Sequence, residues 1–219
     1  MSGAGDGARR PGSGNGRPST PPSADSLEAT PRRFWLAGAT GFLGSHLCRD
    51  LRTRGHQVIA VSRRGGDAVA ALDVCDKDEV AVSARGCDGA FLCTGKVSRD
   101  PADAEQLHRH NVVATRNALA GLRQAGVRRV VVASTSGPIA VSSDASQIAD
   151  EESSAPMDLI ARWPYYRSKL YGEREALGAN APEFEVVIVN PSLLLGPGDL
   201  QGSSTIDVQR FLERAIPAV

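Results

Sequence analysis

Apolar residues along this chain gather in short continuous runs that alternate with longer amphipathic stretches. Runs of about four apolar residues that end at a glycine or a polar residue are typical of strands buried on both faces. Apolar side chains that recur every three or four positions predict helices. Strands are predicted at 34–37, 58–61, 70–74, 90–93, 130–133 and 186–189, and helices at 43–54, 77–84, 102–125 and 165–177. Residues 137–163 are predicted to form a loop.

This alternation predicts the α/β class, with a Rossmann-type doubly wound parallel sheet covered on both faces. Residues 1–32 are rich in Gly, Pro, Ser and Arg, so they have little to bury and are expected to be a disordered low-complexity tail. Residues 33–200 then form the Rossmann domain. Residues 201–219 are expected to begin a smaller C-terminal domain that is largely absent. Four apolar residues define one face of a helix there: Val208, Phe211, Leu212 and Ala215.

Composition narrows the class of protein. The 25 Lys and Arg residues balance the 25 Asp and Glu residues, so no overall field favours nucleic acid or a membrane as partner. No apolar run approaches the roughly 18 residues that span a bilayer. The four cysteines form no C-x-x-C pair and lack histidines at zinc-ligand spacing, so no metal site is predicted. Reduced thiols and a cytoplasmic location are expected.

The first predicted strand runs into a glycine turn, Gly38-Ala39-Thr40-Gly41-Phe42-Leu43-Gly44. Glycines at this spacing let the backbone approach a pyrophosphate, and the helix N-terminus that follows favours its negative charge. The second strand ends in Ser62-Arg63-Arg64, with no carboxylate before Asp67. A hydroxyl and two guanidinium groups suit a 2′-phosphate, so NADP is predicted rather than NAD.

Tyr165 and Lys169 form a Y-x-x-x-K pair on one face of a predicted helix. A nearby cation lowers the pKa of a phenol, and such a tyrosine can exchange a proton with a carbonyl or alcohol oxygen. Ser134, Thr135 and Ser136 end the strand at 130–133, at the edge of the sheet where ligands bind. One of these hydroxyl groups is expected beside Tyr165.

Six features follow one another along the chain: GATGFLG, DV, the small-residue segment Cys93-Thr94-Gly95, VVVASTSG, YYRSK and VNPSLLLGPGD. In this order they resemble the extended short-chain dehydrogenase/reductase family, which is the NAD-dependent epimerase/dehydratase family, and within it the dihydroflavonol 4-reductase-like branch. The resemblance implies that Tyr165 is the general acid/base, and that Lys169 holds the nicotinamide ribose and lowers the pKa of Tyr165. It also implies that Ser136 orients the substrate, with Thr135 as the alternative.

The same resemblance implies a set of cofactor contacts. Asp73 and Val74 would flank the adenine, and the segment from Cys93 to Gly95 would lie beside the pyrophosphate and ribose. Pro191 and Ser192 would touch the nicotinamide amide. The full expected set is Gly38, Thr40, Gly41, Phe42, Leu43, Gly44, Ser62, Arg63, Arg64, Asp73, Val74, Cys93, Thr94, Gly95, Tyr165, Lys169, Pro191 and Ser192.

The expected function is that of an NADP-dependent oxidoreductase. It would transfer hydride between nicotinamide and a carbonyl or secondary alcohol of a small organic substrate. A sugar-nucleotide epimerase or dehydratase with bound NAD is one alternative, and a non-catalytic NADP sensor or inactive fragment is another. A small molecule is the expected partner, and a homodimer stays open. Asn111 is expected to pack or cap a helix, with a proton-relay role as the alternative, and His108 and His110 are expected to face solvent.

Overall fold

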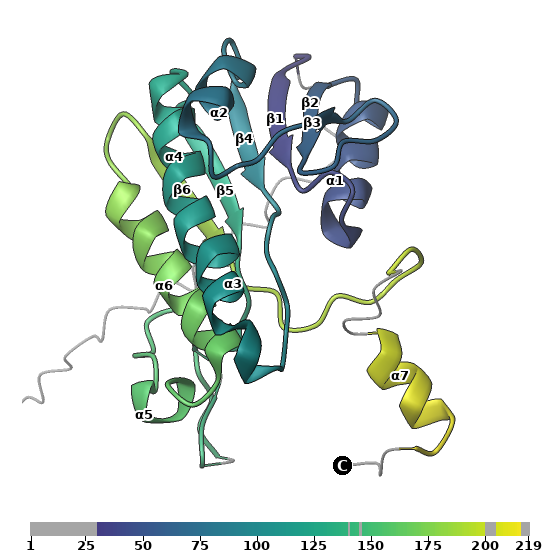
Figure 1. Ribbon diagram of the computed structural model, residues 1–219, viewed down its shortest axis with the longest axis vertical. Coiled ribbons are helices and arrows are strands. Elements are labelled where there is room, and N and C mark those ends of the chain that lie inside the picture. Colours follow the sequence, from purple (N-terminus) through teal and green to yellow (C-terminus); the bar gives the residue numbers. More distant parts are fainter. Residues whose placement is uncertain (1–29, 140, 145, 200–204, 216–219) are drawn as a thin grey trace, which may run out of the picture. The chain divides into compact units, whose positions relative to one another are not determined.

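The computed structural model describes residues 30–139, 141–144, 146–199 and 205–215. Its centre is a six-stranded sheet with the order β3-β2-β1-β4-β5-β6 (Figure 1). All neighbouring strands are parallel. The strands are β1 Arg33–Ala37, β2 Gln57–Ser62, β3 Ala70–Ala71, β4 Gly89–Leu92, β5 Arg129–Ala133 and β6 Glu185–Val189. This is the predicted Rossmann-type sheet, and its chain order reverses at β1, between β2 and β4.

The helices connect these strands in the predicted sequence. They are α1 Phe42–Thr53, α2 Lys77–Ser83, α3 Ala104–His108, α4 Ala114–Gln124, α5 Met157–Ile160, α6 Pro164–Ala179 and α7 Thr205–Leu212. Among the described residues, no helix is long and apolar enough to cross a membrane. Figure 1 shows α4 and α6 side by side, with β5 and β6 behind them.

Three elements differ clearly from the predicted ones. Strand β3 has two residues where five were predicted, because the Asp73 side chain accepts a hydrogen bond from the Cys75 amide and turns the chain. The loop predicted at 137–163 contains the short helix α5. Helix α6 continues past Gly178 to Ala179, so this glycine lies inside the helix and does not end it.

The helix predicted at 102–125 follows one helical path, but it is not one regular α-helix. It begins with a 3-10 turn at Pro101–Asp103, continues as α3, widens into a π-helical turn at Arg109–Val113 and resumes as α4. Such π-turns often occur at functional sites.

One face of the sheet is well covered along its whole width. Helices α2, α4 and α6 belong to this face, and α4 contacts both of the others. The row of strand residues beneath them stays largely buried from β2 to β6: Val61, Ala37, Leu92, Val132 and Ile188. Apolar burial on this side holds the strands and the three helices together.

Within the described ranges, the opposite face is covered only at one end. Helix α1 packs on β1 and β2, around Leu36, Cys48 and Leu51. The corresponding row of residues runs from buried to exposed across the sheet: Ala60, Leu36, Phe91, Val131 and Val187. On β6, Val187 is 37% exposed and Val189 is 42% exposed. The prediction of helices on both faces is therefore met fully on one face and only over β1 and β2 on the other.

The expected tail, residues 1–32, lies outside the described residues up to position 29. Strand β1 begins at Arg33, where the Rossmann domain was predicted to begin. Of the residues expected to start a second domain, only 205–215 are described. On α7, Val208, Phe211 and Leu212 are exposed, and Ala215 lies past the end of that helix.

Candidate active site

The glycine turn between β1 and α1 is tightly packed. The amides of Gly38 and Ala39 both donate to the Val61 carbonyl of β2, at 3.0 and 3.2 Å. Gly38 has φ +80°, a conformation that favours glycine. A Cβ atom on Gly44 would overlap the Gly38 carbonyl, and one on Gly38 would meet the Cys93 backbone. The backbone of the turn therefore lies where side chains could not, and this geometry fits the close approach of a pyrophosphate.

Helix α1 presents its N-terminus at this turn. No described side chain caps Gly41, and the first turn contains no acidic residue. The free amides and the helix dipole therefore favour an anion at this position. Thr40 is exposed, while Phe42 and Leu43 are partly buried at the start of the helix.

The end of β2 has the predicted cationic character. Arg63 and Arg64 are exposed, and the Arg63 guanidinium donates to Nε2 of His110 at 3.2 Å. Ser62 is buried, and its hydroxyl donates to the Gly65 carbonyl at 3.3 Å, so it closes the turn after β2. The two arginines thus lie free of the sheet, whereas the serine hydroxyl is already engaged.

The segment after β3 divides into a polar and an apolar part. The Asp73 carboxylate accepts from the Cys75 amide at 3.0 Å and lies 3.8 Å from Arg109. Val74 points into the core. Burial, together with the nearby Asp73, raises the pKa of the Cys75 thiol. The Asp73 side chain therefore interacts with polar partners, while the Val74 side chain packs in the core.

The loop that follows β4 is held against the glycine turn and helix α6. The Cys93 amide donates to the Ala37 carbonyl at 3.0 Å, and Gly95 lies close to Asn111 Oδ1 and Lys169 Nζ. Burial raises the pKa of the Cys93 thiol to about 11, although the nearby Lys169 ammonium opposes the rise. Cys93 is therefore a neutral thiol at neutral pH.

Asn111 in the π-turn fixes this loop. Its side chain is 3% exposed and forms a two-way bridge to Lys96, accepting from the amide at 2.8 Å and donating to the carbonyl at 2.9 Å. It also donates to the Ser168 hydroxyl on α6 at 2.9 Å. Helix α6 approaches closely because Gly172 faces the Asn111 carbonyl. The structure thus gives Asn111 the packing role expected from the sequence.

Helix α6 brings Tyr165, Lys169 and Glu173 onto one face, one turn apart. The Lys169 ammonium donates to the Ala133 carbonyl at the end of β5, at 2.9 Å. Burial lowers the pKa of Lys169 from 10.5 to about 8, although Glu173 and Cys93 oppose this change. Lys169 is thus a partly desolvated cation at the edge of the sheet.

The pKa of Tyr165 is raised above its ordinary value, chiefly by burial and then by Tyr166, while a hydrogen bond with the Thr135 hydroxyl opposes the rise. Lys169 is not among the groups that shift the pKa of Tyr165 in the protein without a ligand, so the expected lowering stays a prediction for the complex. The physical reason is that burial is the largest influence on the phenol. Moreover, the ammonium of Lys169 is directed at the Ala133 carbonyl.

The hydroxyl segment after β5 is anchored through its backbone. The Ser134 amide donates to the Val189 carbonyl at 2.8 Å, and the Ser136 amide donates to the Pro191 carbonyl at 3.2 Å. The Ser134 hydroxyl is buried and has no hydrogen-bond partner among the described residues. Of the three hydroxyl groups, that of Thr135 interacts with Tyr165. Pro191 and Ser192 follow β6 directly beside this segment.

Three residues that the sequence reading did not select also lie at the site. Asn190 donates to the Thr135 carbonyl at 3.0 Å and to the Glu173 carboxylate at 2.7 Å, so it ties β5, β6 and α6 together. Glu173 could have been found from its spacing on the same helix face as Tyr165. His110 is partly buried against Arg63, which corrects the expectation that it faces solvent. Arg63 and His110 are 47 positions apart, and only the tertiary structure brings them together.

Comparisons with known proteins agree with this geometry. The profile of the NAD dependent epimerase/dehydratase family matches residues 35–218. The chain is 36% identical over 194 residues to a "Putative dihydroflavonol 4-reductase" of Synechocystis sp., covering 84% of this chain and 56% of the relative. It is 28% identical to a human "Sterol-4-alpha-carboxylate 3-dehydrogenase, decarboxylating", covering 78% of this chain and 46% of that one. The chain spans about half the length of the curated relatives it matches.

Solved structures with the same fold include the crystal structure of gox2253, with a TM-score of 0.74 and 26% identity over 86% of this chain and 60% of that one. Another is MoeE5 in complex with UDP-glucose and NAD, with a TM-score of 0.68 and 27% identity over 85% of this chain and 62% of that one. The glycine turn, the parallel sheet and the match over residues 35–218 lead to one assignment. The chain belongs to the NAD-dependent epimerase/dehydratase family of extended short-chain dehydrogenases/reductases.

Proposed function

We propose that this chain is the nucleotide-binding part of an NADP-dependent oxidoreductase that acts on a carbonyl or secondary alcohol of a small organic molecule. The observation that carries the proposal is the meeting of three groups at the carboxyl edge of the sheet. The Lys169 ammonium lies on the Ala133 carbonyl, the Tyr165 phenol lies against Thr135, and the glycine turn packs on Cys93. A cofactor and a substrate oxygen would meet at this edge.

The preference for NADP is supported by the end of β2. Arg63 and Arg64 are exposed, and no carboxylate follows β2 before Asp67. A carboxylate at this position would bind ribose hydroxyls and repel a 2′-phosphate, whereas guanidinium groups bind the phosphate with charge-assisted hydrogen bonds. The bound nicotinamide would supply or accept the hydride.

The residues of the chain would handle the proton. Tyr165 would give a proton to the substrate oxygen in reduction, or take it in oxidation. Lys169 would hold the nicotinamide ribose, and its positive charge would favour the phenolate once it leaves the Ala133 carbonyl. Ser136 would orient the substrate oxygen, with Thr135 as the alternative because it interacts with Tyr165.

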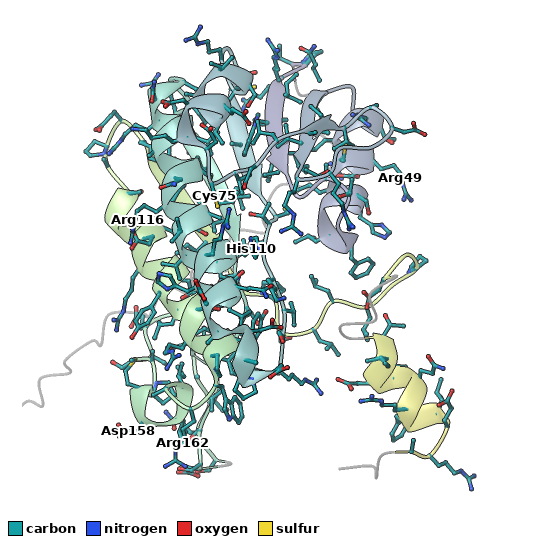
Figure 2. All side chains as sticks on the ribbon, viewed as in Figure 1. Arg49, Cys75, His110, Arg116, Asp158 and Arg162 are labelled. Atoms are coloured by element: carbon teal, nitrogen blue, oxygen red, sulfur yellow. The ribbon has the colours of Figure 1, made fainter. Side chains whose placement is uncertain are left out.

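The cofactor proposal is tested by nucleotide binding. Hydrogen bonds to charged groups contribute about 1.5–3 kcal/mol, so NADPH should bind roughly 10- to 100-fold more tightly than NADH. The Arg63→Ala variant should lose most of this preference, while Arg162→Ala, an exposed arginine beside α5 (Figure 2), should keep it. Calorimetry that gave equal affinities for both nucleotides with the unaltered chain would overturn the NADP assignment.

The catalytic proposal is tested in a chain extended to the length of its relatives. Tyr165→Phe should lower kcat by about 10²–10⁴, the usual loss when a general acid/base is removed, and should leave NADPH affinity intact. Tyr171→Phe is a matched control on the same helix, because Tyr171 packs under Arg174. If Tyr165→Phe turned over like the unaltered protein, another group would have to supply the proton.

A sugar-nucleotide epimerase or dehydratase with bound NAD is the second candidate. The similarity to MoeE5, whose solved complex contains UDP-glucose and NAD, favours it. Such an enzyme would copurify with NAD and would bind a UDP-sugar without net oxidation. The cofactor released by denaturing the purified protein therefore separates the two candidates.

A further inference from the structure

Arg63 and His110 form a contact that the proposed function does not yet use. The two residues are 47 positions apart, and their side chains meet at 3.2 Å where β2 ends. A guanidinium group has only donors, so His110 Nε2 must be the acceptor. The ring therefore carries its hydrogen on Nδ1 and is neutral in the protein without a ligand.

The charges around His110 are mainly positive. Burial lowers the pKa of His110, and Arg63, Arg109 and Lys96 lower it further, while Asp73 acts in the opposite direction. Asp73 is itself 3.8 Å from Arg109, and Lys96 pairs with Asp103 at 3.3 Å. No carboxylate pairs with Arg63 among the residues that the structure describes. An anion beside Arg63 would therefore find a cation and a neutral, protonatable ring.

We propose that His110 is a specificity-determining residue that binds the 2′-phosphate of NADP(H) together with Arg63. On binding, Arg63 turns its donors from His110 to the phosphate, and His110 takes one proton from solvent and donates it in a hydrogen bond to a phosphate oxygen. This inference rests on the proposed preference for NADP. It implies that the preference for NADP over NAD increases as the pH falls.

The direction of this pH dependence follows from the charge of the His110 ring in the free protein and in the complex. In the free protein, burial and then the surrounding cations lower the pKa of His110 and favour the neutral ring, whereas in the complex the phosphate dianion would stabilise the imidazolium. The complex therefore binds more protons than the free protein, so lower pH favours it. The 2′-phosphate has its own pKa near about 6, which acts in the opposite direction, but it does so equally in every variant.

The test uses adenosine 2′,5′-bisphosphate as the probe and 5′-AMP as the ligand that lacks the 2′-phosphate. Calorimetry at about pH 6 and about pH 8, in buffers of different ionisation enthalpy, gives both the affinity and the number of protons taken up. Relative to the unaltered chain, His110→Gln should bind the bisphosphate about 10-fold more weakly at the lower pH, change little at the higher pH, and take up fewer protons. Binding of 5′-AMP should be unaffected.

Two further variants complete the experiment. His108→Gln is the matched control, because this exposed histidine lies two positions earlier on the same helical path. His110→Lys places a permanent cation there and should bind the bisphosphate tightly at both pH values. If His110→Gln and the unaltered chain had the same affinity ratio and proton uptake, the role of His110 would be overturned while the NADP assignment stood. If the unaltered chain bound the bisphosphate and 5′-AMP with equal affinity, the role of His110 and the NADP assignment would both be overturned.

Discussion

Lys169 is a cation that folding places in an unfavourable environment. Burial lowers its pKa from 10.5 to about 8, and its ammonium has one backbone acceptor, the Ala133 carbonyl. A site that keeps such a group in place without a ligand is typical of a surface prepared for a charged or polar partner. The stability given up at this residue is regained when the partner binds.

The pH dependence of stability follows from this shift. Between about pH 8 and 10.5 the folded state has lost the Lys169 proton while the unfolded state retains it, so this group's contribution to stability rises with pH. Lys169→Met removes the contribution. The gain in unfolding free energy from this substitution should therefore be largest near pH 7 and shrink towards about pH 10, as measured by urea unfolding. Lys77→Met, exposed on α2, controls for the loss of a lysine charge. A constant gain across this range would contradict the burial of the charge.

Gly44 allows a second residue-level prediction. Its added Cβ would overlap the Gly38 carbonyl, so Gly44→Ala should displace the turn, lower the unfolding free energy by about 1–3 kcal/mol and abolish NADPH binding. Gly178→Ala is the opposite case, because nothing lies within 4 Å of its added Cβ inside α6. That variant should be stabilised by roughly 0.5–1 kcal/mol. Thermal unfolding with and without nucleotide measures both, and a tolerated Gly44→Ala would mean that the turn is looser than described.

At the residue scale, the sequence is informative where chemistry follows local spacing. The glycine turn and the Tyr165 and Lys169 pair are visible because each is set within a few residues of chain. The raised pKa of Tyr165 and the contact between Arg63 and His110 are not visible in this way. They depend on burial and on segments that are distant in the chain.

At the scale of elements, the π-turn at Arg109–Val113 connects the helical layer to the loop that follows β4. It sets Asn111 so that one amide binds the loop after β4 and the Ser168 hydroxyl on α6. Helical periodicity predicts the whole segment as one helix, because it does not distinguish a single π-turn from the α-helical turns on either side. The short helix α5 was missed for a different reason, since four residues are too few to show periodicity.

The hydrogen bonds of Asn111 predict the effect of removing its side-chain amide. Asn111→Ala leaves the partly buried Lys96 amide and carbonyl without their partner, which costs up to about 1–3 kcal/mol per group. It should also loosen the loop containing Gly95 and weaken nucleotide binding. Asn117→Ala, which removes a single hydrogen bond to the Cys75 carbonyl, is the control with the smaller loss. Equal losses from both variants, by chemical unfolding, would show that the bridge to Lys96 contributes nothing beyond one bond.

At the scale of the whole molecule, the part of the chain that the structure describes covers one face of the sheet from β2 to β6 and the other face only over β1 and β2. The exposed valines of β6 and the exposed apolar side chains of α7 belong to a chain that spans about half the length of its relatives. The strand order, the class and the parallel direction followed from the alternation of apolar runs and helices. The sequence did not predict which face of the sheet is exposed. The residues of β6 form a continuous apolar run whether one or both of its faces are packed.

The partly covered face of the sheet predicts the behaviour of the isolated chain. Replacing Val187 and Val189 with threonine keeps the strand propensity and lowers the exposed apolar area, so it should raise the fraction that stays monodisperse in light scattering. Val82→Thr, on the exposed side of α2, is the control because this valine lies away from the sheet. If the double variant aggregated as much as the control, association would have to arise from another surface.

The order of the strands in the sheet also affects how the chain can fold during its synthesis. Strand β1 is made first among the described strands, yet it lies in the middle of the sheet and pairs with β4, which begins 56 positions later at Gly89. Until then Trp35 and Leu36, both fully buried in the folded protein, have no partner on that side. During synthesis this first strand therefore stays exposed on that side, and slower translation of residues 38–88 would lengthen its exposure.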